Sequence, residues 1–293
     1  MSQIGLGCVT FGREIDQEQS FEMMDYALEH EINLFDTASA YQNGTSETIV
    51  GKWLVSRRSG TDHIIVATKI APPYVYDRMV ESVDQSLKRL AVDRIDLLYF
   101  HSWDDSVLTE DALFTIDKLV KQGKIHKIGA SNFSGDQLQD SIAIQKYNGL
   151  TCFQYAQNNH NLAVSDLTRD FKELCQNNKI DIVTYSPLGA GFLTGKYNSG
   201  PITGSRFEII PGHKNIYFNE PALKKLEMLR GISESTGYST THLALVWAFH
   251  QPGLKAVLVG GRNISQLEQA FAAKQFNDKE VLVNLNRISG WII

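Results

Sequence analysis

The sequence predicts an α/β protein in which one domain, residues 1–293, folds as a (β/α)8 TIM barrel. Short apolar runs alternate with longer segments of helical periodicity along the whole chain. Such alternation is typical of a parallel sheet with right-handed crossovers. We count eight strand-then-helix units with no linker between them. Eight units in about 290 residues fit a closed barrel better than an open doubly wound sheet.

Each expected strand is a short apolar run followed by polar residues. The third is the clearest, because Ile64-Ile65-Val66-Ala67 is unbroken and mostly β-branched, as expected for a strand buried on both faces. We expect strands at residues 4–9, 33–36, 63–68, 95–100, 125–130, 152–155, 181–185 and 256–259.

The segments between the strands carry apolar residues at helical spacing, as Phe21, Met24 and Leu28 illustrate. We expect helices at residues 21–28, 46–57, 80–90, 113–120, 138–147, 166–177, 221–236, 240–250 and 264–273, the last followed by a short tail. Residues 187–220 have no clear period and are rich in Gly, Pro, Ser and Asn. A loop of that length in a compact domain is usually functional.

Composition and charge indicate the cellular compartment and exclude some classes of binding partner. The net charge of −5 makes nucleic acid or an anionic membrane an unexpected partner. Three cysteines without a CxxC pair argue against a disulfide framework or a cysteine-based metal site. The N-terminus lacks the pattern of a signal peptide, and no apolar run approaches about 18 residues. We therefore expect a cytoplasmic protein that binds no metal, and we expect it to be a monomer.

Polar residues at the carboxyl ends of barrel strands are the first candidates for function. Four of them are Asp36, Tyr41, Lys69 and His101. A Lys ammonium beside a Tyr hydroxyl lowers the pKa of the phenol, and an Asp keeps that ammonium charged. A His beside the Tyr can orient a carbonyl oxygen. Together they form a general acid suited to carbonyl reduction, which also requires a hydride donor such as a nicotinamide.

Taken singly, each of these residues has an ordinary structural explanation. A strand-end Asp usually caps a turn, a Lys is usually solvated, and a His is more often a structural hydrogen-bond donor. The functional interpretation rests on all four residues occurring at strand ends.

Three stretches identify a family resemblance. They are residues 35–38 (FDTA) with Tyr41, residues 129–133 (GASNF), and residues 185–188 (YSPL) with residues 193–197 (LTGKY). In this order and spacing they resemble the aldo-keto reductases, and the similarity runs from Gly5 to about Ala272. Its closest match is to the potassium-channel β-subunit-like and aldose dehydrogenase-like branches. The resemblance implies a barrel that binds NADPH/NADP+ and reduces aldehydes or ketones, or oxidises the corresponding alcohols or sugars.

The resemblance also implies residue roles. Tyr41 is similar to the proton donor, Lys69 and Asp36 to the pair that tunes it, and His101 to the residue that orients the substrate. Ser131, Asn132 and Gln154 resemble the partners of the nicotinamide carboxamide, and Tyr185 the aromatic residue stacked on its ring. The resemblance places the pyrophosphate on Ser186, Pro187, Leu188, Gly189, Leu193, Gly195 and Lys196.

A glycine-rich turn, Gly260-Gly261-Arg262, leads into the last predicted helix. Such a turn is a ready anion site, and Arg262 adds a bidentate phosphate partner. The resemblance places the adenosine 2′-phosphate there, on Arg262 and Gln266, which favours NADPH over NADH. Gln269 stands where the family usually has Glu at the adenine.

Pocket walls are expected from Phe11, Trp103 and Asp104, which follow strands at the predicted mouth. Trp103 could stack on a sugar or an aromatic ring, and Asp104 could bind hydroxyl groups. The expected partner is therefore a small carbonyl compound or a sugar. Two other functions remain open: a regulatory subunit that keeps the cofactor as a redox sensor, and a biosynthetic enzyme that uses the same site for another step such as an elimination.

Overall fold

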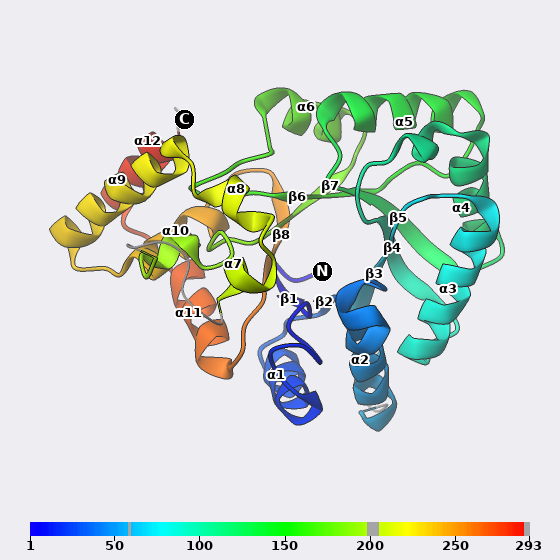
Figure 1. The fold of residues 1–293 in the computed structure, drawn as a ribbon, viewed down its shortest axis with the longest axis horizontal. Helices are drawn as coiled ribbons and strands as arrows, with labels where there is room; N and C mark the ends of the chain where they lie inside the picture. The colour runs from blue at the N-terminus through cyan, green and yellow to red at the C-terminus, as the bar shows by residue number, and fades with distance from the viewer. Residues whose placement is uncertain (58–59, 198–204, 290–293) are drawn as a thin grey trace.

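Eight parallel strands close into a barrel in the order β1 to β8, with β8 pairing back onto β1 (Figure 1). The computed structural model describes residues 1–57, 60–197 and 205–289. The strands are β1 (Ile4–Gly7), β2 (Leu34–Asp36), β3 (Ile65–Ile70), β4 (Ile95–Phe100), β5 (Ile125–Ser131), β6 (Tyr155–Asn159), β7 (Asp181–Tyr185) and β8 (Leu254–Val259). The predicted (β/α)8 fold is confirmed.

Helices surround the barrel, and each predicted helix is present (Figure 1). They are α1 (Gln17–Glu29), α2 (Thr45–Ser56), α3 (Tyr76–Leu90), α4 (Glu110–Lys121), α5 (Gly135–Tyr147), α6 (Arg169–Asn177), α9 (Glu220–Thr236), α10 (Thr240–Phe249) and α11 (Ile264–Lys274). Local signals fix their starts: Asp16 and Ser134 each form a capping box at the N-termini of α1 and α5.

The strands alternate their side chains between the helices and the barrel interior. The lower interior is filled by a cluster that includes Leu34, Ala67, Tyr155 and Val183. Two positions further along the same strands, and so on the same face, stand Asp36, Lys69, Gln157 and Tyr185. The barrel is thus packed at its base, and polar residues replace the apolar ones at its carboxyl end.

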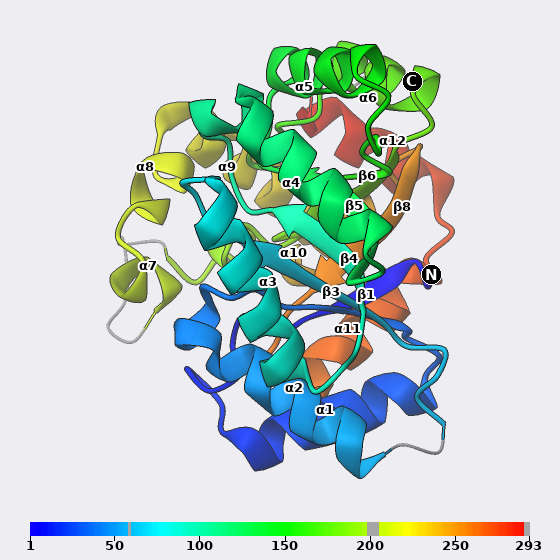
Figure 2. The ribbon, with the colours of Figure 1, turned by 90° about the vertical axis from the view of Figure 1, so that its right-hand side faces the viewer.

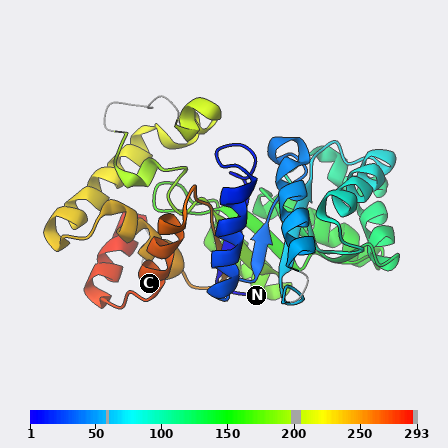
Figure 3. The same ribbon diagram turned by 90° about the horizontal axis from the view of Figure 1, so that it is seen from below.

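The segment after β7 carries short helices at this same end. They are η3 (Phe192–Thr194), α7 (Arg206–Ile209) and α8 (His213–Tyr217). Figures 2 and 3 show α7 at the opposite end of the barrel from the N-terminus. The expected long loop, residues 187–220, is therefore partly helical, and its residues 198–204 lie outside the described part of the chain.

Two expectations about elements are wrong. The sixth strand was expected at residues 152–155, but β6 covers Tyr155–Asn159. Every residue of β6 is buried, but Gln157, Asn158 and Asn159 are polar. The strand therefore lacks the apolar pattern on which the prediction relied. The short tail expected after residue 273 instead contains α12 (Lys279–Ser289), which packs on α9 and α10. None of the helices in the described residues is long and apolar enough to cross a membrane.

Candidate active site

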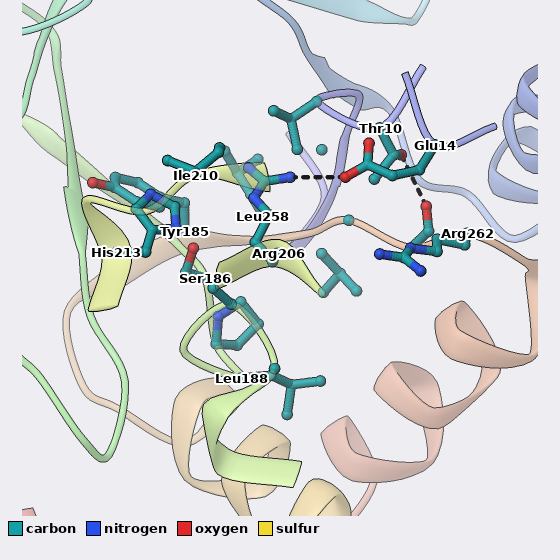
Figure 4. A pocket seen from close by; sticks show the side chains of 18 of the residues that line it. Thr10, Glu14, Tyr185, Ser186, Leu188, Arg206, Ile210, His213, Leu258 and Arg262 are labelled. Atoms are coloured by element: carbon teal, nitrogen blue, oxygen red, sulfur yellow. Dashed lines mark hydrogen bonds and ion pairs between the residues drawn. The ribbon is translucent and has the colours of Figure 1, made fainter. Parts of the chain in front are cut away.

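A cavity of about 950 Å³ opens at the carboxyl end of the strands. Its lining includes both Tyr41 and His101 and, from the turn before α11 and from α11 (Ile264–Lys274) itself, Arg262 and Gln266. Figure 4 shows Tyr185 and Arg262 on opposite sides of this space. The cavity therefore joins the predicted reaction residues to the predicted anion site in one continuous volume.

Lys69 lies at the centre of the reaction residues. Its side chain is 1% exposed, and its ammonium forms an ion pair with Asp36. It also donates to the carbonyl oxygen of Thr37 at 2.8 Å and to the hydroxyl oxygen of Tyr41 at 3.4 Å. A buried ammonium is costly unless its protons are bound, and here each of the three has an acceptor.

Gln157, rather than Gln154, reaches the reaction residues. Its side-chain amide donates to the second carboxylate oxygen of Asp36 at 2.8 Å. Gln154 precedes β6, and its side-chain oxygen accepts from the backbone of Ile128 at 3.0 Å. The expectation that Gln154 lies at the cavity is therefore wrong, and Gln157 lines the cavity instead. The cause is the misplaced strand, which put the wrong glutamine at the strand end.

The pKa of Tyr41 is raised above its ordinary 10.0, contrary to our expectation. Burial is the largest cause; Lys69 lowers the pKa as predicted, but Asp36 raises it again. Burial also opposes the charge on Lys69, yet Asp36 and Tyr41 together raise the pKa of the ammonium. The site thus holds a protonated tyrosine beside a charged lysine.

The ring of His101 stands edge-on to that of Tyr41, with centroids 5.8 Å apart. Burial, and then the charge of Lys69, lower the pKa of His101 to about 4. Near pH 7 the imidazole is neutral and can offer one N–H to an oxygen atom beside the Tyr41 hydroxyl. Asn132 fixes this region, because its side-chain amide donates to the backbone carbonyl of His101 at 2.9 Å.

Asn132 also connects to Tyr185. The Tyr185 hydroxyl donates to the side-chain oxygen of Asn132 at 2.5 Å, and the Asn132 amide reaches the Ser131 hydroxyl at 3.2 Å. Asn132 adopts the left-handed conformation (φ 60°), which asparagine tolerates better than most residues. The ring of Tyr185 is thereby held as one wall of the cavity.

The chain after β7 turns sharply through left-handed residues, among them Ser186 (φ 56°) and Gly189 (φ 57°). Ser186, Pro187, Leu188 and Lys196 line the cavity. The other predicted residues of this turn support it from behind. Leu193 is buried in the core, Gly189 packs against Tyr217, and Gly195 ends η3 in a left-handed conformation.

The turn predicted to bind an anion, at the start of α11, is held by backbone and side-chain hydrogen bonds. The Thr10 hydroxyl donates to the carbonyl of Gly261 at 2.9 Å (Figure 4). The Gln266 side-chain oxygen accepts from the backbone N–H of Arg262 at 2.8 Å. Gly260, Gly261, Arg262, Gln266 and Gln269 all line the cavity. These bonds hold the backbone at Gly261 and Arg262, and the Arg262 side chain is exposed.

Comparison with known proteins decides the family. Residues 3–282 match the Aldo/keto reductase family. The chain belongs to this family. This aldo/keto reductase is 29% identical to the uncharacterised oxidoreductase YrpG of Bacillus subtilis, over 98% of this chain and 92% of that protein. It is 31% identical to the aldo-keto reductase YhdN of the same organism, over 100% of this chain and 86% of that protein.

A third relative is an Arabidopsis thaliana protein named "Probable voltage-gated potassium channel subunit beta". It is 28% identical, over 90% of this chain and 84% of its own length. The predicted family resemblance is confirmed, and the protein is an oxidoreductase of the aldo-keto reductase type.

The residues predicted to line the substrate pocket lie elsewhere in this aldo/keto reductase. Phe11 is fully buried in the core. Trp103 packs edge-on against Phe133, with centroids 5.1 Å apart. Asp104 caps η2 (Asp105–Leu108) by accepting from the backbone of Ser106. None of the three lines the cavity, although other residues of the same segments after β1 and β4 do.

Other residues, which sequence reasoning missed, take their place. Arg13, Glu14, Gln42 and Asn43 line the cavity, together with Arg206 from α7. Arg13 forms an ion pair with Glu14 at 2.6 Å, and Arg206 approaches the same carboxylate at 3.4 Å (Figure 4). The signal in the sequence was position: Arg13 and Glu14 lie in the segment between β1 and α1, and Gln42 and Asn43 directly follow Tyr41. Within the described residues, no group of three His, Cys, Asp or Glu residues is placed to hold a metal.

Proposed function

We propose that this aldo/keto reductase uses NADPH to reduce an aldehyde or ketone, or NADP+ to oxidise the corresponding alcohol or sugar. The observation that carries the proposal is the Tyr41 hydroxyl, which faces the cavity 3.4 Å from the Lys69 ammonium and beside His101. In the reductive direction, Tyr41 gives its proton to the carbonyl oxygen, and His101 donates a hydrogen bond that orients that oxygen.

The raised pKa of Tyr41 agrees with this role, since a proton donor must be protonated before it acts. As the proton leaves, negative charge develops on the Tyr41 oxygen. The ammonium of Lys69 stabilises this charge, and Asp36 keeps Lys69 charged in a buried position. When bound, NADPH supplies the hydride.

The lining suits a dinucleotide carrying an extra phosphate. Tyr185 offers an aromatic wall, and Ser131 and Asn132 offer amide and hydroxyl groups near it. Lys196 and Arg262 add positive charges along the same cavity. Phosphate groups pair well with such charges, and Arg262 stands at a helix start that favours anions. We propose that Arg262 holds the 2′-phosphate and that Gln157 replaces Gln154 at the carboxamide.

The substrate end is polar. Arg13, Glu14, Gln42 and Asn43 present charged and amide groups around the approach to Tyr41. Sites of this kind reject ligands that leave such groups without hydrogen bonds. We therefore propose a small hydrophilic carbonyl compound or a sugar as the substrate, in place of the aromatic stacking once expected of Trp103.

The test is NADPH oxidation with a panel of small aldehydes, ketones and aldoses, alongside direct measurement of NADPH binding. Turnover that favours the hydroxylated compounds supports the proposal. A chain that binds NADPH but turns over nothing on the panel would favour the regulatory subunit, the second candidate that the potassium-channel relative suggests. Failure to bind NADPH would refute both. A product formed without change in NADPH would indicate an elimination.

A further inference from the structure

A buried group of polar side chains lies behind the turn that follows β7. It consists of Asn159 and Asn161, at and just beyond the end of β6, and Tyr217 from α8. These residues are 6%, 1% and 2% exposed, so they are part of the protein interior. None of them lines the cavity. Three buried polar residues side by side need a reason, because burying polar groups is costly unless they hydrogen-bond.

Asn161 is the centre of this group, and its side-chain oxygen and amide nitrogen bind different segments of the chain. The oxygen accepts from the backbone N–H groups of Ala163 and Val164, at 3.1 and 3.0 Å, which closes the turn after β6. The amide nitrogen donates to the backbone carbonyl of Ser186 at 3.0 Å and to the side-chain oxygen of Asn159 at 3.0 Å. The chain after β6 is thereby tied to the chain after β7.

Tyr217 joins α8 to the same group. Its hydroxyl donates to the side-chain oxygen of Asn159 at 3.2 Å and lies 3.3 Å from the Asn161 amide. Its ring fills the space beside Gly189, where an added Cβ would meet the ring at 2.9 Å. The glycine thus lets the ring pack directly against the turn.

The backbone that Asn161 holds is an unfavourable one. Ser186 has φ 56°, a left-handed conformation that costs free energy in a residue with a side chain. The Ser186 carbonyl accepts from Asn161 and also from the N–H of Gly189 at 2.8 Å. Ser186 follows Tyr185 directly, so the turn and the aromatic wall of the cavity share this support.

We propose that Asn161, assisted by Tyr217, is a positioning residue that holds residues 186–191 in the shape required to bind the diphosphate–nicotinamide part of the dinucleotide. This inference rests on the proposed function for its ligand. Asn161 acts through Ser186 and does not touch the cofactor or the substrate.

Asn161→Asp is the sharpest variant. It keeps the size of the side chain and the oxygen that closes the turn at residues 163–164. It replaces the amide donor with a second oxygen that faces the Ser186 carbonyl and the Asn159 oxygen. Tyr217→Phe is a milder second variant and decides the matter if Asn161→Asp does not fold. The matched control is Asn148→Asp, since Asn148 donates to the Ile144 carbonyl at an exposed helix end.

Two readouts are needed. The first is hydrogen exchange in the ligand-free protein, which requires no cofactor: Asn161→Asp should accelerate exchange in residues 186–195 and leave α11 unchanged. The second is NADPH affinity, measured at a temperature well below the unfolding transition of each variant. We expect Kd for NADPH to rise about tenfold, since a buried acceptor loses its donor. Binding of adenosine 2′-phosphate, which lacks the diphosphate, should not change.

The outcomes separate the two proposals. Unchanged exchange in residues 186–195 overturns the inference, whatever the wild type binds. Faster exchange with an unchanged Kd for NADPH also overturns it, because Asn161 would then be merely structural. A wild type that binds no NADPH refutes the proposed function, while the exchange data still decide whether Asn161 holds the turn.

Discussion

Gln157 donates its side-chain amide to Asp36 at 2.8 Å, across 121 positions of sequence. Asp36 therefore divides its two oxygens between the Lys69 ammonium and the Gln157 amide. This fixes the carboxylate that keeps Lys69 charged. It also connects β6 to β2 across the mouth of the barrel, where a ligand ring would rest beside Tyr185.

Gln157→Leu tests this relationship. The variant leaves one oxygen of a buried carboxylate without a donor, so kcat should fall about tenfold or more. Gln154→Leu is the control, because the Gln154 side chain accepts from the Ile128 backbone and does not line the cavity. It should cost about 1 kcal/mol of unfolding free energy and leave the kinetics unchanged. Steady-state kinetics give kcat, and urea unfolding gives the free energy of unfolding, for both variants. A loss of kcat in Gln154→Leu but not in Gln157→Leu would assign Gln154 to the site.

Tyr41→Phe removes the proposed proton donor and, with it, one of the three acceptors of the Lys69 ammonium. NADPH binding should persist, while kcat should fall by about 10² or more, the usual contribution of a positioned general acid. Binding titration and turnover with the best substrate of the panel give the two numbers. Tyr238→Phe, at an exposed position on the outer surface, should behave as wild type. Normal turnover by Tyr41→Phe would mean that another group supplies the proton.

Two histidines, the partly buried His101 and the fully buried His160, should make the protein less stable in acid. The pKa values are lowered to about 4 for His101 and about 3 for His160, in both cases chiefly by burial. The unfolded chain binds these protons near pH 6.5, so stability is complete above that pH. It is lost as the pH falls from 6.5 toward 4, by about 3 kcal/mol for His101.

Urea unfolding between pH 4 and 7.5 measures this dependence. His160→Asn, away from the cavity lining, should make the slope between pH 6.5 and pH 4 shallower. In the same range, kcat/KM should show no transition near 6.5, because His101 stays neutral. An enzyme whose activity titrates near 6.5 would contradict the neutral imidazole.

Arg262→Ala tests the phosphate assignment. A charge-assisted bond to a phosphate is worth about 1.5–3 kcal/mol, so Kd for NADPH should rise about tenfold or more. Kd for NADH, which lacks the 2′-phosphate, should change little. Arg287→Ala, on the exposed side of α12, is the matched control. Equal weakening of both dinucleotides would move the 2′-phosphate away from Arg262.

Sequence patterns alone predicted the fold class and the four residues proposed to carry the reaction. The alternation of strands and helices is a local pattern, and parallel strands in a closed barrel must bring their carboxyl ends to one mouth. Asp36, Lys69 and His101 could therefore be placed together without knowing any side-chain position. The position of β6 was predicted wrongly because three of its five buried residues are Gln or Asn, which give no hydrophobic pattern.

Features that depend on contacts between distant segments could be assigned only from the folded chain. Whether Gln154 or Gln157 reaches Asp36 depends on which residues of the chain form β6. Whether Phe11 lines the cavity or is buried in the core depends on the conformation of the segment after β1. The pKa of Tyr41 is a balance between burial and two opposite charges, which no list of residues can weigh. The hydrogen bond from the Asn161 amide to the Ser186 carbonyl forms because the segments after β6 and β7 lie side by side in the folded chain. Such a bond requires the two atoms to be about 3 Å apart, whatever their separation in sequence.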